Sequence, residues 1–275
     1  NLSTHNQQEN TMTIDKPKIK PSFGGLISLI NILRGPEGCP WDAEQNMGSL
    51  IPLFLEECYE LVDAVEVADH ENLIEEIGDV LLHIAFQISL GESDGRFNEN
   101  TVCIRTSEKY KRRHPHVFGD GKADSIGELE GNWERIKREE KTLDNQSHVD
   151  GIPRSLPALS YALAIQKKAA KTGFDWTSGK ELRAKVWEEI NEIDAAQSLD
   201  EKQEELGDLL FTIVNECRWM EIDPEQALRQ SNRKFSDRFK GMEKISEEEN
   251  KDFTNLKPSD KDILWNRAKR QASEE

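Results

Sequence analysis

The chain has 275 residues, of which 32% are charged and 36% hydrophobic, and its formal net charge is −17. This length allows one large domain or two ordinary ones, each with its own core. The negative charge argues against general binding to nucleic acid polymers or anionic membranes, while a local basic cluster remains able to hold a small polyanion. The four cysteines form no C-x-x-C pair, which fits a reduced cytoplasmic setting.

The N-terminal segment is polar and has no apolar stretch typical of a signal peptide. Residues 1–20 are therefore expected to form a disordered extension. The longest apolar helical stretch carries Glu75, Glu76 and Asp79, which excludes it as a membrane span. The sequence predicts a cytoplasmic protein with no membrane contact.

Apolar residues recur at helical spacing along most of the chain, and no run alternates with the period of a strand. The spacing predicts helices over 26–33, 50–67, 72–90, 101–113 and 128–141. The expected fold class is therefore all-α, built from helical bundles.

The helical pattern lapses over residues 142–157, where glycine, proline and polar residues gather. After this segment the same order of elements returns. We therefore expect a first helical module at 21–141, a linker at 142–157 and a second helical module at 158–275.

Both halves carry one acidic pattern, in which Glu-Glu-x-x-Glu is followed by Glu-x-x-Asp. The two copies are Glu56, Glu57, Glu60, Glu76 and Asp79, and then Glu188, Glu189, Glu192, Glu205 and Asp208. Glu57 precedes Glu189 by 132 residues, the same offset that separates Trp133 from Trp265. Such constant offsets predict a tandem duplicated module.

Acidic residues spaced by three or four positions share one face of a helix, and a short turn joins the two acidic helices of each module. Carboxylates that converge between such helices repel each other unless a cation is present. Oxygen ligands suit magnesium, with manganese as an alternative. The predicted ligand sets are Glu57, Glu60, Glu76 and Asp79 in the first module and Glu189, Glu192, Glu205 and Asp208 in the second. Solvated surface acids are the alternative, which the duplication disfavours.

Comparison of the two halves also removes some candidate metal ligands. His83 lies one turn from Asp79, but its counterpart is Thr212. His114 and His116 correspond to Phe239 and Gly241 and are expected to serve a turn or the surface.

Basic residues recur beside the acidic pattern at a spacing of one helical turn. The pairs are Lys109 with Arg113, Lys234 with Arg238, Trp133 with Lys137, and Trp265 with Lys269. Cations next to a carboxylate-rich metal site favour a substrate with several phosphates. The tryptophan either stacks on a base or closes the core.

Several motifs then carry a resemblance to a known family. In chain order they are Gly38-Cys39-Pro40-Trp41-Asp42, Leu55-Glu56-Glu57-x-x-Glu60, Glu76-Ile77-Gly78-Asp79-Val80-Leu81, Arg112-Arg113-His114-Pro115-His116-Val117-Phe118, Ile152-Pro153-Arg154-Ser155-Leu156-Pro157-Ala158-Leu159, Gly173-Phe174-Asp175-Trp176 and Glu204-Glu205-Leu206-Gly207-Asp208-Leu209-Leu210-Phe211. From about residue 24 to its C-terminus the chain resembles the MazG family of nucleoside triphosphate pyrophosphohydrolases, in its tandem two-module form.

The resemblance implies an all-α fold, usually a homodimer, that uses a magnesium-activated water to hydrolyse NTPs or dNTPs to the monophosphate and pyrophosphate. It implies that the second module is the active one. There the metal ligands, acting in catalysis through the metal and its water, would be Glu189, Glu192, Glu205 and Asp208. The residues holding the phosphates and nucleotide would be Lys185, Lys234, Arg238, Trp265 and Lys269.

The sequence itself favours the second module, because Lys185 has Leu53 as its counterpart in the first. One position departs from the family pattern. The family can place a lysine four residues before the second acidic pair, where this chain has Glu201.

Two other classes of protein are alternatives. A di-iron carboxylate bundle needs Glu-x-x-His on two helices, and neither acidic pair has it. A non-catalytic helical module that binds nucleotides or protein partners remains the main alternative.

Overall fold

The computed structural model describes residues 18–122, 125–140 and 147–271, and these contain helices and no strand. The predicted all-α class is thereby confirmed. The chain divides into two units, Asn1–Glu140 and Lys141–Glu275. The expected disordered extension lies mostly outside the described residues, and so do residues 142–146 of the expected linker. The rest of the expected linker, up to Pro157, contains no helix.

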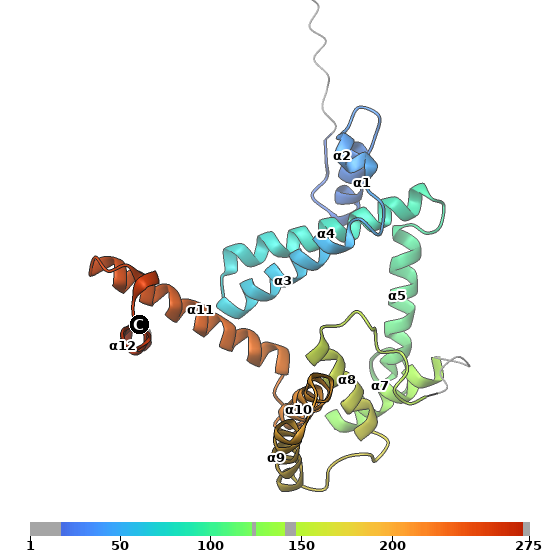
Figure 1. Cartoon of the computed structure of the whole chain (residues 1–275). Coiled ribbons are helices and arrows are strands. Elements are labelled where there is room, and N and C mark those ends of the chain that lie inside the picture. The colour runs from blue at the N-terminus through green and yellow to red at the C-terminus, as the bar shows by residue number, and fades with distance from the viewer. Residues whose placement is uncertain (1–17, 123–124, 141–146, 272–275) are drawn as a thin grey trace, which may run out of the picture. The chain divides into compact units, whose positions relative to one another are not determined.

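The first unit is formed by seven helices in its described part (Figure 1). They are α1 (Phe23–Leu33), α2 (Pro40–Glu44), α3 (Ile51–Val67), α4 (His70–Ser93), α5 (Glu99–Arg113), α6 (Pro115–Phe118) and α7 (Ile126–Glu140). The short α2 and α6 were not predicted, since a helix of one turn has no measurable periodicity.

The second unit contains α8 (Ala158–Ala170), α9 (Gly179–Ala195), α10 (Leu199–Trp219), α11 (Pro224–Glu248), the 3₁₀ turn η1 (Phe253–Asn255) and α12 (Pro258–Gln271). Here α9 and α10 pack on each other, α8 packs on α10, and α12 packs on α11 (Figure 1).

Tight turns make the two acidic helices of each unit antiparallel neighbours. Between α3 and α4 the chain reverses at Ala68, which has a left-handed φ of 57°, and Asp69 then caps α4 by accepting a hydrogen bond from the Asn72 amide at 3.2 Å. Between α9 and α10 the reversal ends at Ser198, which forms a reciprocal capping box with Glu201.

Each unit has its own apolar core. In the first, Ile30, Leu50, Phe86 and Leu90 pack together and fix α1 and α3 against α4. In the second, Met242, Ile245, Leu264 and Ala268 hold α12 on α11. No helix in the described ranges is long and apolar enough to cross a bilayer.

Candidate functional site

Three of the four predicted acidic ligands converge in the second unit. Glu189 and Glu192 on α9 and Glu205 on α10 place carboxylate oxygens within 4.8 Å of one another. Glu189 is only 3% exposed, so this charge is largely removed from water. The fourth, Asp208, lies one turn beyond Glu205 and lines a cavity together with Glu189.

The acids disturb each other electrostatically. Burial raises the pKa of Glu205 above its ordinary value, and the negative charges of Glu192, Glu189 and Asp208 raise it further. Raised carboxylate pKa values mean that the ionised cluster is unfavourable on its own. A divalent cation bound by these oxygens would relieve that cost, so the donor set fits magnesium or manganese.

Lys185 supplies the positive charge nearest to this cluster among the described residues. Its Nζ lies 2.7 Å from Glu188, 2.9 Å from Glu189 and 3.9 Å from Glu192. Hydrogen bonds from the lysine to Glu188 and Glu189 hold the pKa of Lys185 well above its usual range. The sequence-predicted phosphate ligand is thus placed at the acidic cluster.

The other predicted phosphate ligands lie elsewhere in this chain. Lys234 and Arg238 are on α11, and Trp265 and Lys269 are on α12. The Arg238 guanidinium lies 5.6 Å from the centre of the Trp265 ring, which also packs on the core between α11 and α12. None of the four is among the described residues that line the cavity at the acids. The prediction that these residues hold the substrate next to the acids stays a prediction.

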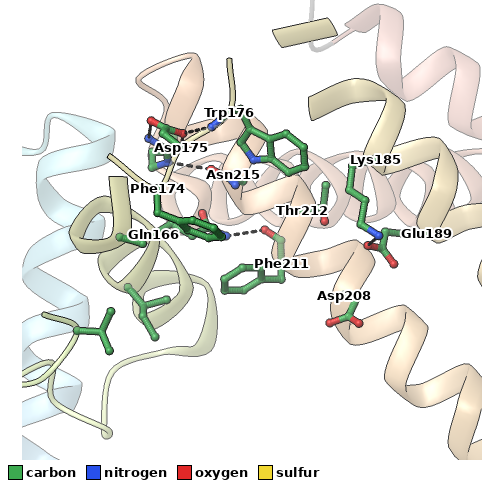
Figure 2. A pocket seen from close by; sticks show the side chains of 14 residues that line it. Gln166, Phe174, Asp175, Trp176, Lys185, Glu189, Asp208, Phe211, Thr212 and Asn215 are labelled. Carbon is green, nitrogen blue, oxygen red and sulfur yellow. Dashed lines mark hydrogen bonds and ion pairs between the residues drawn. The ribbon is translucent and has the colours of Figure 1, made fainter. Parts of the chain in front are cut away.

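The cavity has a volume of about 700 Å³ and opens between α8, α9 and α10. Figure 2 shows Lys185, Glu189 and Asp208 at one end and Phe174, Trp176 and Gln166 at the other. It falls within the size range of cavities that hold small molecules.

The residues of the aromatic end were not singled out from the sequence. The Gly173-Phe174-Asp175-Trp176 motif contributes to the family resemblance, but the sequence assigns it no role. In the structure Arg218 and the Trp219 ring nitrogen both donate hydrogen bonds to Asp175, which ties this loop to α10. The pKa of Asp175 is lowered chiefly by the Arg218 hydrogen bond.

Comparison with known proteins identifies the family. The sequence model of the MazG nucleotide pyrophosphohydrolase domain matches residues 45–118 and 177–242. The chain is 41% identical to a protein from Escherichia coli K12 named nucleoside triphosphate pyrophosphohydrolase, over 90% of this chain and 96% of that protein. It is 42% identical to a protein from Thermotoga maritima named nucleoside triphosphate pyrophosphohydrolase/pyrophosphatase MazG, over 90% of this chain and 95% of that protein. This chain belongs to the MazG family.

Two further comparisons cover only part of one of the two chains. The Bacillus subtilis protein YabN is 43% identical over 90% of this chain and 51% of its own. A solved structure of a MazG-related protein from Thermotoga maritima is 28% identical, covers 41% of this chain and 96% of its own, and has a TM-score of 0.36.

Both MazG modules contain an acidic cluster. In the first module Glu57, Glu76 and Asp79 place carboxylate oxygens within 4.8 Å of one another. Burial is the main cause that raises the pKa values of Glu57 and Glu76, and Glu60 adds to both. Glu76 is 5% exposed, and its Oε2 has no hydrogen-bond partner among the described residues. This orphaned buried oxygen also fits a cation ligand.

The first module departs from the second in what surrounds its acids. Leu53, the counterpart of Lys185, packs against the core. His83 lies 3.9 Å from Glu57, and burial lowers the pKa of His83, so it is neutral near pH 7 and adds no cation. His114 forms the turn between α5 and α6, and His116 is exposed.

Glu201, which stands where the family can place a lysine, has a structural role in this chain. Glu201 accepts hydrogen bonds from the backbone amides of Gln197 at 2.7 Å and Ser198 at 3.3 Å. These bonds lower the pKa of Glu201. Glu201 therefore caps the N-terminus of α10.

Proposed function

We propose that this MazG-family chain hydrolyses nucleoside and deoxynucleoside triphosphates to the monophosphate and pyrophosphate, and that its second module is the active one. The observation that carries the proposal is the acidic cluster of Glu189, Glu192 and Glu205, of which Glu189 lines a cavity together with Lys185 and Asp208. An enzyme of this class is a hydrolase of phosphoric anhydrides, as are the proteins to which the chain is similar.

The reaction adds water to phosphorus and breaks the anhydride bond that joins the α- and β-phosphates. A magnesium ion held by Glu189, Glu192, Glu205 and Asp208 would supply activation of that water and neutralisation of phosphate charge. Lys185 binds and orients a phosphate next to these acids. Glu188, which is exposed, shares the Lys185 ammonium and keeps it charged.

We infer that the working molecule is a homodimer. The α10 helix exposes Leu206, Leu210 and Ile213, which form a stripe at positions i, i+4 and i+7. The first module exposes Ile77, Leu81 and Ile84 at the equivalent positions of α4. Apolar stripes at helical spacing favour packing against another helical surface, and a second copy of the chain offers the same stripes.

A second copy also explains the separation of acids and cations. Because α12 packs on α11 rather than at the acids, we infer that Lys234, Arg238, Trp265 and Lys269 of one protomer serve the acidic cluster of its partner. The substrate phosphates would then lie between the acids of one chain and the cations of another.

The direct test measures pyrophosphate release from a panel of NTPs and dNTPs in the presence of magnesium. We expect activity in the wild type and its loss in Glu205→Gln and in Asp208→Asn, with the circular dichroism spectrum unchanged and a cooperative melting transition retained. Glu204→Gln, an exposed neighbour on the same helix, is the matched control and keeps activity. Glu76→Gln removes an acid of the first module and is expected to leave most of the activity.

If Glu205→Gln and Asp208→Asn kept full activity and Glu76→Gln lost it, the first module would be the active one. Nucleotide binding without any pyrophosphate release would identify the chain as a non-catalytic nucleotide-binding module instead.

A further inference from the structure

The aromatic end of the cavity contains a buried amide whose orientation is fixed. Gln166 on α8 is 5% exposed, and its Nε2 donates a hydrogen bond of 2.8 Å to the backbone carbonyl of Phe211 on α10. A carbonyl oxygen only accepts hydrogen bonds, so the amide nitrogen must be the atom that faces it. The Oε1 atom is thereby turned the other way.

That Oε1 atom is an acceptor without a donor. It is buried and has no hydrogen-bond partner within the described residues, and Gln166 lines the cavity. Leaving a buried polar atom unpaired costs free energy. A ligand with an N–H at this position would remove the cost.

Aromatic surface next to Gln166 is available to the same ligand. Phe174 is 82% exposed and Phe211 is 44% exposed, and both line the cavity. Figure 2 shows the two rings and the Gln166 amide on the same side of the cavity, away from Lys185 and Glu189. A flat heterocycle that stacks on such rings presents its edge, with its N–H groups, to a neighbouring acceptor.

The length of the cavity connects this end to the acids. Asp208, Thr212 and Asn215 lie on one face of α10 at positions i, i+4 and i+7 and all line the cavity. At 1.5 Å per residue this face spans about 10 Å, comparable to the length of a nucleoside. Gln166 is hydrogen-bonded to Phe211, which lies between Asp208 and Asn215 on α10, so a nucleoside that extends from Asp208 along this face passes Gln166.

We propose that Gln166 selects the nucleobase, and that its Oε1 accepts a hydrogen bond from an exocyclic amine. The inference rests on the proposed function and names its substrate class: nucleotides of amino-bearing bases such as cytosine and adenine. A terminal amine reaches a lone acceptor at the edge of the ring, whereas the ring N–H of uracil lies between two carbonyl oxygens. Uracil carries a carbonyl where cytosine carries its amine, so it brings an acceptor against an acceptor.

The test measures kcat/KM for CTP and UTP with the wild type and with Gln166→Met, which keeps the side-chain length. The wild type is expected to prefer CTP by about tenfold or more, since sites built around a hydrogen bond reject analogues that lack it. In Gln166→Met the ratio of kcat/KM for CTP to that for UTP is expected to fall below about threefold, because the interaction between the amine and the Gln166 acceptor is gone. Gln230→Met, an exposed glutamine on α11, keeps the wild-type ratio.

A second measurement needs no variant and remains informative if Gln166→Met fails to fold. The wild type is compared on ATP and on purine riboside triphosphate, which differs by loss of the exocyclic amine. We expect a rise in KM of about tenfold for the analogue, the cost of one unpaired buried acceptor. Equal KM values for these two substrates, or a CTP to UTP ratio unchanged in folded Gln166→Met, would overturn the role of Gln166. Absence of pyrophosphate release from every triphosphate would instead contradict the proposed function.

Discussion

Lys185 and Glu189 form an ion pair one turn apart on α9, with 2.9 Å between Nζ and Oε1. Glu189 is 3% exposed, so it contributes a buried charge that needs compensation, and Lys185 provides part of it. The first module has no such pair, because Leu53 stands at the equivalent position and packs in the core. This difference separates two modules that otherwise share their acids.

Replacement of Lys185 by methionine is predicted to reduce kcat/KM by about 10- to 100-fold, the range expected when a charge-assisted contact to phosphate is removed. Methionine keeps much of the apolar stem but leaves the buried Glu189 charge without this partner, so the melting temperature is expected to fall, and rates are compared well below it. Initial rates of pyrophosphate release over a range of NTP concentrations measure the effect. Lys180→Met, on the exposed side of the same helix, serves as control. Unchanged kcat/KM in Lys185→Met would remove this lysine from the substrate site.

Divalent metal is predicted to stabilise the folded protein even without nucleotide. Burial and mutual repulsion raise the pKa values of Glu76 and Glu205, so the ionised clusters destabilise each module until a cation binds. At 100 times the dissociation constant, one magnesium site adds about 2.7 kcal/mol to the free energy of unfolding. Differential scanning fluorimetry with increasing MgCl₂ should show a rise in melting temperature that EDTA reverses.

The matched control for metal binding is KCl at equal ionic strength, because general screening also weakens repulsion between carboxylates. Glu76→Gln and Glu205→Gln should each lose part of the magnesium-dependent rise, and the double variant should lose nearly all of it. Equal stabilisation of all four proteins by magnesium would place the metal elsewhere.

The acidic helices were predictable because their information is local. The sequence predicted helices over 50–67 and 72–90, and the structure has them at Ile51–Val67 and His70–Ser93. Spacing along a helix determines which carboxylates share a face, and a short turn determines which helices are neighbours. The convergence of the acids follows from these two facts alone.

The remaining features depend on packing between elements distant in sequence. The amide of Gln166 faces Phe211 because α8 lies on α10, and no periodicity reports that contact. Trp265 and Arg238 were assigned to the substrate site by the family resemblance, whereas in the structure α12 packs on α11 and neither residue lines the cavity at the acids. A comparison of the two repeats also overlooks any residue whose type differs between the copies. Glu140 is an example, because its counterpart is Ala272.

Stability of the first module is predicted to depend on pH through Glu140. Arg113 donates two hydrogen bonds to Glu140 Oε2, at 2.9 and 2.5 Å, and Arg112 binds Oε1 at 2.6 Å. The Arg113 hydrogen bond is the main cause that lowers the pKa of Glu140 below its ordinary 4.5. A lowered pKa contributes stability above pH 4.5, and this contribution is lost as pH falls through the folded-state value.

Glu140→Gln is therefore expected to lower the free energy of unfolding by about 1–3 kcal/mol at pH 7, with a difference from wild type that narrows below pH 4.5. Urea unfolding monitored by tryptophan fluorescence at several pH values measures it. Glu139→Gln is the control, since Glu139 pairs only with Arg135 among the contacts described and is 60% exposed, a pair worth less than about 0.5 kcal/mol. Equal effects of the two substitutions at pH 7 would contradict a special role for Glu140.

Mixing of two inactive variants is predicted to restore activity if each site combines acids of one protomer with cations of the other. Glu205→Gln damages the acidic set, and Arg238→Ala damages the cation set. In a mixed dimer with two-fold symmetry broken only by these changes, one site carries both defects and the other carries none. Random assembly then yields roughly a quarter of the wild-type pyrophosphate release. The matched control mixes Glu205→Gln with Asp208→Asn, which damage the same set and should show no recovery. No recovery in the first mixture as well would mean that acids and cations of one chain serve the same site.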